Sequence, residues 1–259
     1  MKIYYYYHIS KTGGSSVVEF FKHIARTIPK CKFYNYNDWD RLTPTPKDID
    51  FESILCPTPA KFDYIFIHHH HGYHGLMHYK EYLARKKQEL ANDGHTMKIF
   101  TTIRDVVEFN NSRLNYIRNK WGWSGNRIDF LTDDTHFNIQ TKYLFFCWHG
   151  EWPKELEEGT KTAKVVVDGI RKLNRECIDE LSDVIDLFVN TCNLTAFIKA
   201  MSRHLRVRYD DFTRKNASRH FIKFDDRRSD LLKNNKLDCY MLGQYGNKNF
   251  ESEVNKFFL

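Results

Sequence analysis

The stretch that most constrains the fold of this chain is a polar, glycine-containing turn near its start. Residues 4–9, YYYYHI, form a predicted buried strand, and apolar side chains recur at helical spacing over residues 17–24. The segment KTGGSS, residues 11–16, lies between them. Glycines let a backbone approach a ligand closely, serines cap helices, and a helix N-terminus presents unpaired N–H groups. The turn is therefore a predicted anion site, to which Lys11 adds positive charge.

The same order of strand and helix occurs twice more along the chain. Residues 62–67 and 97–103 are apolar runs typical of buried strands, and helical patterns follow over residues 79–92 and 106–119. Three such units predict an α/β fold with a P-loop-like central parallel sheet flanked by helices on both faces. Ligands of such sheets gather at the C-terminal ends of the strands, where the polar motifs of this chain also fall.

Shorter patterns extend this fold toward the C-terminus. Further strands are expected over residues 32–36 and 186–189, and further helices over 138–148, 162–181, 195–205 and within 227–258. Residues 38–59 hold four of the six prolines, so we expect an ordered surface loop there that shapes an acceptor cleft. Because no internal repeat or linker divides the chain, residues 1–259 are predicted to form a single domain.

Composition restricts the class of protein. Hydrophobic residues make up 41% of the chain, which suits a packed globular protein. The formal net charge of +7 suits an anionic cofactor or acceptor, but without a compact basic block we expect no nucleic-acid partner. No signal peptide and no apolar stretch of about 18 residues is recognisable, so a cytoplasmic protein without membrane association is expected. The six scattered cysteines are expected to be reduced thiols.

The first turn resembles a loop of a known enzyme family. Residues 8–16, HISKTGGSS, are similar to the H-I-P-K-T-G-G-T-S loop of the carbohydrate sulfotransferases, the family that includes heparan sulfate 2-O-sulfotransferase. In that family the loop holds the 5′-phosphosulfate of 3′-phosphoadenosine 5′-phosphosulfate (PAPS). Ser10 replaces the usual proline, which removes some rigidity but no ligand contact. The resemblance implies that the donor is bound by Lys11, Thr12, Gly13, Gly14, Ser15 and Ser16.

A second motif, RDVVEFNNS over residues 104–112, begins where a predicted strand ends. It resembles the family's 3′-phosphate segment, which starts with R-D-P and closes with a serine; here Val106 replaces the proline. An arginine at a strand end and a serine two turns into the next helix can converge on one phosphate, and arginine supplies a planar fork of donors. The resemblance implies that Arg104 and Ser112 hold the 3′-phosphate. The competing interpretation is a local ion pair and an exposed serine.

Weaker similarities to the same family continue along the chain. Residues 138–144, NIQTKYL, resemble its N-x-Q-T-R-x-L helix, and residues 237–242 resemble its closing D-x-x-L-Y helix. Residues 186–195 fall where members have a strand followed by G-L-T-E-R-F, but Ala196 stands in place of the glutamate. Residues 216–218, NAS, match an N-x-S element only weakly. We therefore assign specific roles from the first two motifs alone.

Sulfuryl transfer also needs a base, and a histidine suits this task at neutral pH. In relatives the base is a histidine at the end of the central strand, where this chain has HHHHGYH over residues 68–74. Alignment from the strand favours His68 or His69, whereas alignment from the following glycine favours His71. Alternate strand residues share a face, so we predict His69 and His71 as catalytic, with His69 as the first choice. A metal site is disfavoured because consecutive histidines cannot all reach one ion.

The predicted function is transfer of a sulfuryl group from PAPS to a hydroxyl of a saccharide or small metabolite, with adenosine 3′,5′-bisphosphate as product and no metal. Lys11 would neutralise charge on the bridging oxygen. One alternative is a P-loop-like kinase that uses ATP. It is disfavoured because Lys11 precedes the glycines, whereas the lysine follows them in G-x-x-x-x-G-K-[ST], and because no obvious magnesium-binding acid follows a strand. Another alternative is a non-catalytic binding module for anionic glycans.

Overall fold

The computed structural model describes residues 1–37, 61–70, 75–146, 172–209, 223–246 and 249–259. Five strands form one sheet in the order β2-β3-β1-β4-β5, and every neighbouring pair is parallel. The strands are β1 (Lys2–Tyr7), β2 (Cys31–Asn37), β3 (Tyr64–His70), β4 (Thr96–Ile103) and β5 (Leu187–Asn190). The predicted α/β class with a central parallel sheet is confirmed.

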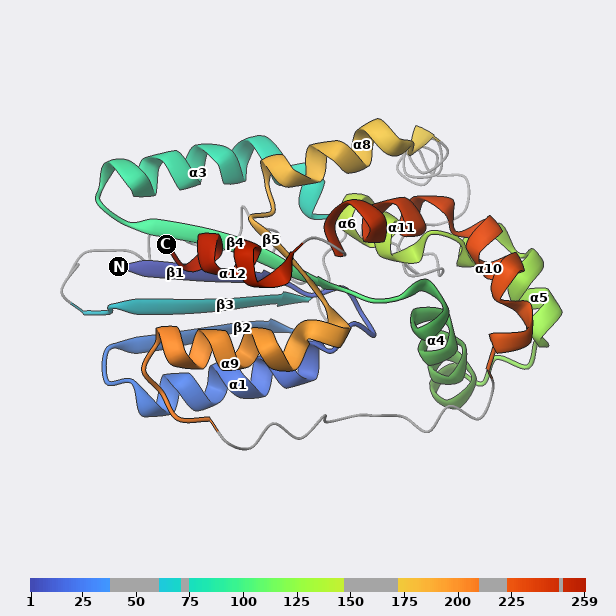
Figure 1. Ribbon diagram of the computed structural model, residues 1–259, viewed down its shortest axis with the longest axis horizontal. Helices are drawn as coiled ribbons and strands as arrows, with labels where there is room; N and C mark the ends of the chain where they lie inside the picture. The colour runs from blue at the N-terminus through green and yellow to red at the C-terminus, as the bar shows by residue number, and fades with distance from the viewer. Residues whose placement is uncertain (38–60, 71–74, 147–171, 210–222, 247–248) are drawn as a thin grey trace.

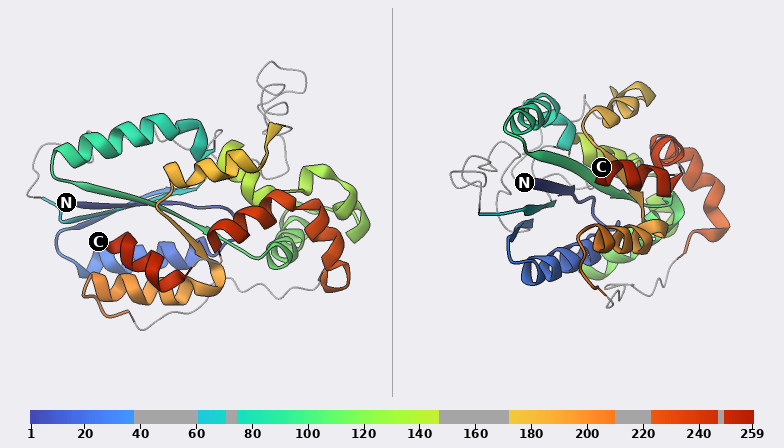
Figure 2. Two further views of the ribbon diagram at one scale, coloured as in Figure 1. Left: turned by 45° about the horizontal axis from the view of Figure 1, so that its top comes forward. Right: turned by 60° about the vertical axis from the view of Figure 1, so that its left-hand side comes forward.

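Helices cover both faces of this sheet (Figures 1 and 2). One face packs on α1 (Gly14–Thr27), α9 (Leu194–His204) and α12 (Phe250–Phe258). The other packs on α3 (Lys80–Asn92), α6 (Ile139–Phe146), α8 (Arg175–Asp179) and α11 (Lys236–Met241). Central strand β1 is covered by helices on both faces: Tyr4 and Tyr6 face the first group of helices, and Tyr5 and Tyr7 face the second. This explains why its sequence is continuously apolar.

Three further helices gather beyond the C-terminal ends of the strands (Figure 1). They are α4 (Val106–Trp121), α5 (Arg127–Thr132) and α10 (Arg228–Asn234). A small separate cluster of buried apolar side chains, which includes Leu114, Phe130 and Phe224, packs between them. This group of helices places α4 next to the end of the sheet where parallel strands present their ligand sites.

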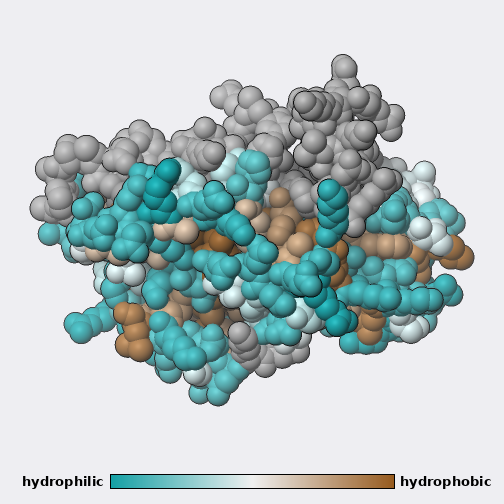
Figure 3. All heavy atoms as spheres, turned by 90° about the horizontal axis from the view of Figure 1, so that it is seen from above, coloured by the Kyte–Doolittle hydropathy of each residue, from teal (hydrophilic) through white to brown (hydrophobic). Residues whose placement is uncertain are grey.

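The α3 side of the molecule has a largely hydrophilic surface where described residues form it (Figure 3). Helix α3 buries Leu83 and Leu90, seven residues apart on one face, and turns charged side chains outward. None of the helices in the described ranges is both long enough and apolar enough to span a membrane.

The structure departs from the sequence prediction at several element ends: strand β1, for example, ends at Tyr7, two residues before the end of the predicted strand. Strand β3 continues to His70, beyond the apolar run, because its three histidines pair with β1 and β2 and are buried there. The helical structure expected over residues 162–181 is interrupted in its described part: Asn174 is extended, and its side chain accepts from the N–H of Cys177 to start the short helix α8. Residues 38–59, expected to be a surface loop, lie outside the described residues.

A buried carboxylate joins α11 to the start of α6. Asp238 is 1% exposed and accepts from Thr141 N at 2.8 Å, Thr141 Oγ1 at 2.7 Å and Gln140 N at 3.2 Å. Burial raises the pKa of Asp238, while these hydrogen bonds act in the opposite direction. The carboxylate therefore satisfies N-terminal N–H groups of a helix that would otherwise be unpaired in the core.

We expect Asp238→Ala to lower the free energy of unfolding by about 2–4 kcal/mol, because it leaves two or three buried donors without an acceptor. Urea unfolding of the two proteins measures this difference. Asp238→Asn is the matched control, since it keeps the shape and one accepting oxygen and should lose less. Equal stability of Asp238→Ala and the wild type would contradict this role for the carboxylate.

Candidate functional site

The candidate site begins with the loop that joins β1 to α1. Strand β1 lies between β3 and β4. Strands β2 and β3 lie on one side of it and the later strands β4 and β5 on the other, so the strand order reverses at β1. Ligands of parallel sheets bind at such switch points. Lys11 in this loop has φ 66°, in the left-handed region, where a non-glycine residue costs about 1 kcal/mol or more. A strained lysine at the switch point of the sheet is typical of a functional loop.

Each glycine of the loop is favoured by its local environment. Gly13 has φ 88°, and a Cβ there would lie 2.8 Å from Leu194 Cδ2. A Cβ on Gly14, the first residue of α1, would overlap the ring of His8. Glycine is favoured at position 13 by its positive φ, since the end of the Leu194 side chain could shift, and at position 14 by the His8 ring, which leaves no room for a Cβ.

The hydroxyl residues of the loop have different environments. Thr12 is fully buried: its Oγ1 donates to Ile9 O at 2.6 Å and lies 2.7 Å from Thr102 Oγ1, so its side chain fastens the loop to β4. Ser16 is 5% exposed, whereas Ser15 is exposed in the first turn of α1. Of the three predicted hydroxyl contacts to the donor, the Ser15 hydroxyl is the most accessible from solvent.

Arg104 is held at the end of β4 by a side chain from α6. Gln140 Oε1 accepts from Arg104 N at 2.8 Å, and Gln140 Nε2 donates to Arg104 O at 2.9 Å. The guanidinium then reaches two groups: Nη1 donates to Lys11 O at 3.3 Å, and Nη2 pairs with Glu108 at 3.0 Å. Gln140 is a positioning residue that sequence reasoning left without a role, although it lies in the NIQTKYL segment that resembles the family.

One face of α4 completes this group. Glu108, Ser112 and Tyr116 are spaced four residues apart and share that face. Lys11 Nζ lies 4.3 Å from the centroid of the Tyr116 ring, and Arg104 pairs with Glu108 one turn before Ser112. Ser112 is 3% exposed, so it is a buried residue of this face and not an exposed helix residue. The structure thus places the two sequence motifs against each other.

The electrostatics of this group favour an anion. Burial lowers the pKa of Lys11, and the positive charges of Arg104 and Lys120 lower it further. The Lys120 ammonium also lies over the Tyr116 ring, 5.5 Å from its centroid. An anion bound among these three cations would relieve their mutual repulsion and restore the proton affinity of Lys11. Asp105 has a structural role beside this group, because its side chain caps α4 by accepting from Val107 N and Glu108 N.

The histidines predicted as the base differ in burial and in the face of the sheet on which they lie. His69 is 0% exposed on the α3 and α6 side of the sheet, with Nδ1 2.6 Å from the Tyr5 hydroxyl. His68 and His70 are also buried, but they contact His8, which lies at the end of β1. His71, the second predicted base, and His74 lie outside the described residues.

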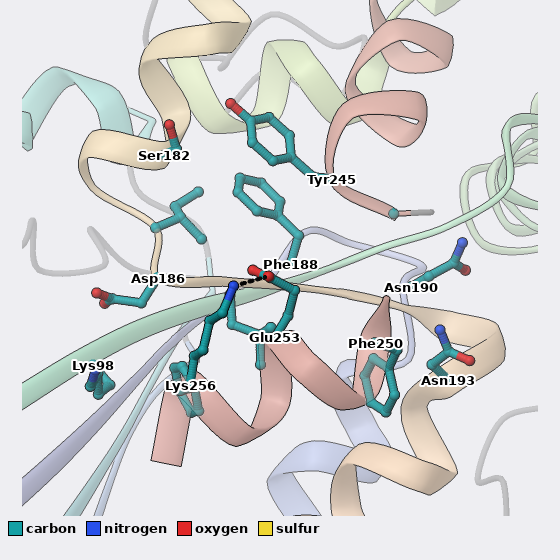
Figure 4. A pocket seen from close by; sticks show the side chains of 14 residues that line it. Lys98, Ser182, Asp186, Phe188, Asn190, Asn193, Tyr245, Phe250, Glu253 and Lys256 are labelled. Carbon is teal, nitrogen blue, oxygen red and sulfur yellow. Dashed lines mark hydrogen bonds and ion pairs between the residues drawn. The ribbon is translucent and has the colours of Figure 1, made fainter. Parts of the chain in front are cut away.

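A pocket of about 330 Å³ lies elsewhere, along edge strand β5 (Figure 4). Tyr245 stacks on Phe188 at one side of it, with ring centroids 4.2 Å apart. Glu253 and Lys256 of α12 form an ion pair at another side, at 3.0 Å. No residue of the predicted site lines this pocket, so it is separate from the loop and from Arg104.

The arrangement at the loop can bind an anion, orient it with an arginine and place histidines beside it. Comparison of the chain with protein-family models, with curated proteins and with solved structures finds no match in any of the three.

Proposed function

We propose that this chain is a PAPS-dependent sulfotransferase that acts on a hydroxyl of a saccharide or small metabolite. One observation carries the proposal: Arg104 Nη1 donates to Lys11 O, although the two residues are 93 positions apart in the chain. Each motif alone is a common local feature, but two phosphate-binding motifs in contact suit a donor with a phosphate at each end. Their resemblance to the carbohydrate sulfotransferases supplies the identity of that donor.

The donor would lie across the C-terminal ends of β1 and β4, in a P-loop-like arrangement. The start of α1, with Gly13, Gly14 and Ser15, would bind the 5′-phosphosulfate through N–H groups and a hydroxyl. Arg104 would exchange its contact with Glu108 for the 3′-phosphate, and Ser112 on the same helix face would add a hydroxyl. Two anchored phosphates fix the sulfur atom in line with an incoming acceptor oxygen.

The electrostatic stabilisation that Lys11 provides would increase during the reaction. As the bond between sulfur and the bridging oxygen breaks, negative charge accumulates on the phosphate of the leaving adenosine 3′,5′-bisphosphate. A partly buried ammonium group is worth more there than in water, because the surrounding dielectric is lower. Contact with the Tyr116 ring, whose centroid lies 4.3 Å from Lys11 Nζ, would hold this charge in place before the substrate binds.

A thermal-shift comparison of adenosine 3′,5′-bisphosphate, ATP with magnesium, and heparin tests this function. At about 100 times its dissociation constant, a ligand stabilises the protein by roughly 2.7 kcal/mol, which raises Tm by about 5–10 °C for a chain of this size. We expect this shift for the bisphosphate and a smaller one for ATP. Equal shifts for both nucleotides would favour a kinase, and a shift with heparin alone would favour a glycan-binding module.

A further inference from the structure

Three histidines form a stack at the end of the sheet, beside the start of α1. His8 follows β1, and its ring stacks on His70 of β3 with centroids 4.0 Å apart. His8 Nδ1 lies 3.1 Å from His68 Nε2, within hydrogen-bond distance. His69 points to the opposite face of the sheet, because neighbouring residues of a strand alternate. The stack is therefore made of His8, His68 and His70, and it excludes His69.

A side chain from β2 sets which nitrogen of His68, and through it which nitrogen of His8, carries a proton. Asn35 Oδ1 lies 2.6 Å from His68 Nδ1, and an amide oxygen only accepts hydrogen bonds, so His68 carries its proton on Nδ1. Burial, the neighbouring His70 and His69, and Lys22 of α1 hold the pKa of His68 well below its usual value, so the ring stays neutral. Its Nε2 is then an acceptor, and His8 must donate from Nδ1. Neutral His8 therefore has its lone pair on Nε2.

The position of His8 places its ring, and the Nε2 edge of that ring, beside the candidate site. A Cβ on Gly14 would overlap the His8 ring, and Nε2 is the ring atom nearest to it. The ring thus lies directly over the first residue of α1, where the donor's phosphosulfate would bind. His8 is half-buried, whereas the side chains of His68, His69 and His70 are all buried. Of these four histidines, His8 is the one with access to solvent.

We propose that His8 is the general base of sulfuryl transfer, and that His68 and Asn35 are positioning residues that hold it in the reactive tautomer. This inference rests on the proposed function. The acceptor oxygen forms a bond to sulfur, the bond from sulfur to the phosphate oxygen breaks, and adenosine 3′,5′-bisphosphate leaves with that electron pair. The proton of the acceptor hydroxyl passes to His8 Nε2. The resulting imidazolium keeps its Nδ1–H bond to His68.

Several described groups lie close to His8 and influence its pH response. Tyr6 of β1 stacks on the ring at 5.5 Å, and His68 and His70 approach from β3. Lys22 of α1 acts on this cluster through His68. Loss of the acceptor at His68 Nε2 would destabilise the protonated form of His8, which would make His8 a weaker base.

The tautomer is measured directly by ¹⁵N-histidine NMR of the full chain, with the His8 signals assigned from His8→Gln. We expect a proton on Nδ1 and a lone pair on Nε2. Asn35→Leu should remove this preference, whereas Asn35→Asp is the matched control that keeps an accepting oxygen. A proton on Nε2 of neutral His8 in the wild type would overturn the proposal.

Activity is measured as the loss of ³⁵S from labelled PAPS with O-desulfated heparin as acceptor, and labelled saccharide and labelled inorganic sulfate are both counted, so that transfer to saccharide and to water are both detected. His8→Ala should lower the rate about 100- to 10,000-fold with unchanged bisphosphate affinity. Asn35→Leu should shift the midpoint of the pH–rate profile to lower pH. Asn35→Asp should not, because its carboxylate keeps the acceptor at His68 and adds a negative charge that favours the protonated form of His8. An active His8→Ala beside an inactive His69→Gln would overturn the proposal in favour of His69. A wild type that binds no bisphosphate would instead overturn the proposed function, and this inference with it.

Discussion

Replacing Lys11 by alanine is expected to lower the turnover of PAPS by about 100- to 1,000-fold, which is the usual effect of removing one group that stabilises charge in a transition state. The affinity for adenosine 3′,5′-bisphosphate should change far less. The reason is that the charge on the bridging oxygen develops during transfer, so the lysine stabilises the transition state more than the bound donor. Single-turnover rates and calorimetric binding of the product measure the two effects separately.

Lys11 has a left-handed backbone conformation, so a substitution there could also change the loop. The effect of removing the charge therefore needs a control of its own. Lys11→Met is the matched control for side-chain length, since it removes the ammonium group but retains contact with the Tyr116 ring. Both variants should lose turnover to a similar degree. A change confined to the Michaelis constant for PAPS would show that Lys11 only helps to bind the donor.

Arg104→Ala is expected to weaken binding of adenosine 3′,5′-bisphosphate by about 1.5–3 kcal/mol, or roughly 10- to 150-fold, because a hydrogen bond to a charged group contributes this much. The 3′-phosphate does not react, so the loss should be the same in the ground state and the transition state. Titration calorimetry of the variant and the wild type measures the difference.

Glu108→Gln provides the matched control for Arg104. Glu108 pairs with the Arg104 guanidinium at 3.0 Å, a contact for which a bound 3′-phosphate would compete. Neutralising Glu108 removes this competition, so the bisphosphate should bind with equal or higher affinity. A loss of affinity in Glu108→Gln as large as that in Arg104→Ala would mean that the ion pair itself, and not the arginine, forms the site.

The sequence predicted the sheet well because its strands are nearly continuous apolar runs and each leads into a helical pattern. It failed where local signals compete. Strand propensity alone does not predict that the histidines at positions 68–70 continue strand β3 and are buried. Hydrogen bonds with Asn35, His8 and Tyr5 make their burial possible. Asn174 interrupts the expected helical segment because its side chain caps the start of α8. The spacing of apolar residues does not predict this cap.

The candidate site could be predicted only as separate motifs. Sequence spacing indicated that Arg104, at a strand end, and Ser112, two turns into the following helix, could converge on one phosphate. The contact of Arg104 with Lys11 could not be predicted in this way, because it depends on β1 and β4 being neighbours. The role of Gln140 could not be predicted, because it depends on α6 packing beside the end of β4. Likewise, His8 was read as part of a loop motif, and only the pairing of β1 with β3 places it against His68 and His70.

The most direct test of a site built for two phosphates is the affinity of the wild type for adenosine 3′,5′-bisphosphate relative to adenosine 5′-monophosphate, measured by titration calorimetry. The two nucleotides differ only in the 3′-phosphate, which Arg104 and Ser112 would bind. We expect the bisphosphate to bind at least about 10-fold more tightly, as one charge-assisted hydrogen bond implies. Equal affinities would show that no 3′-phosphate is recognised and would contradict the assignment of this chain as a PAPS-dependent sulfotransferase.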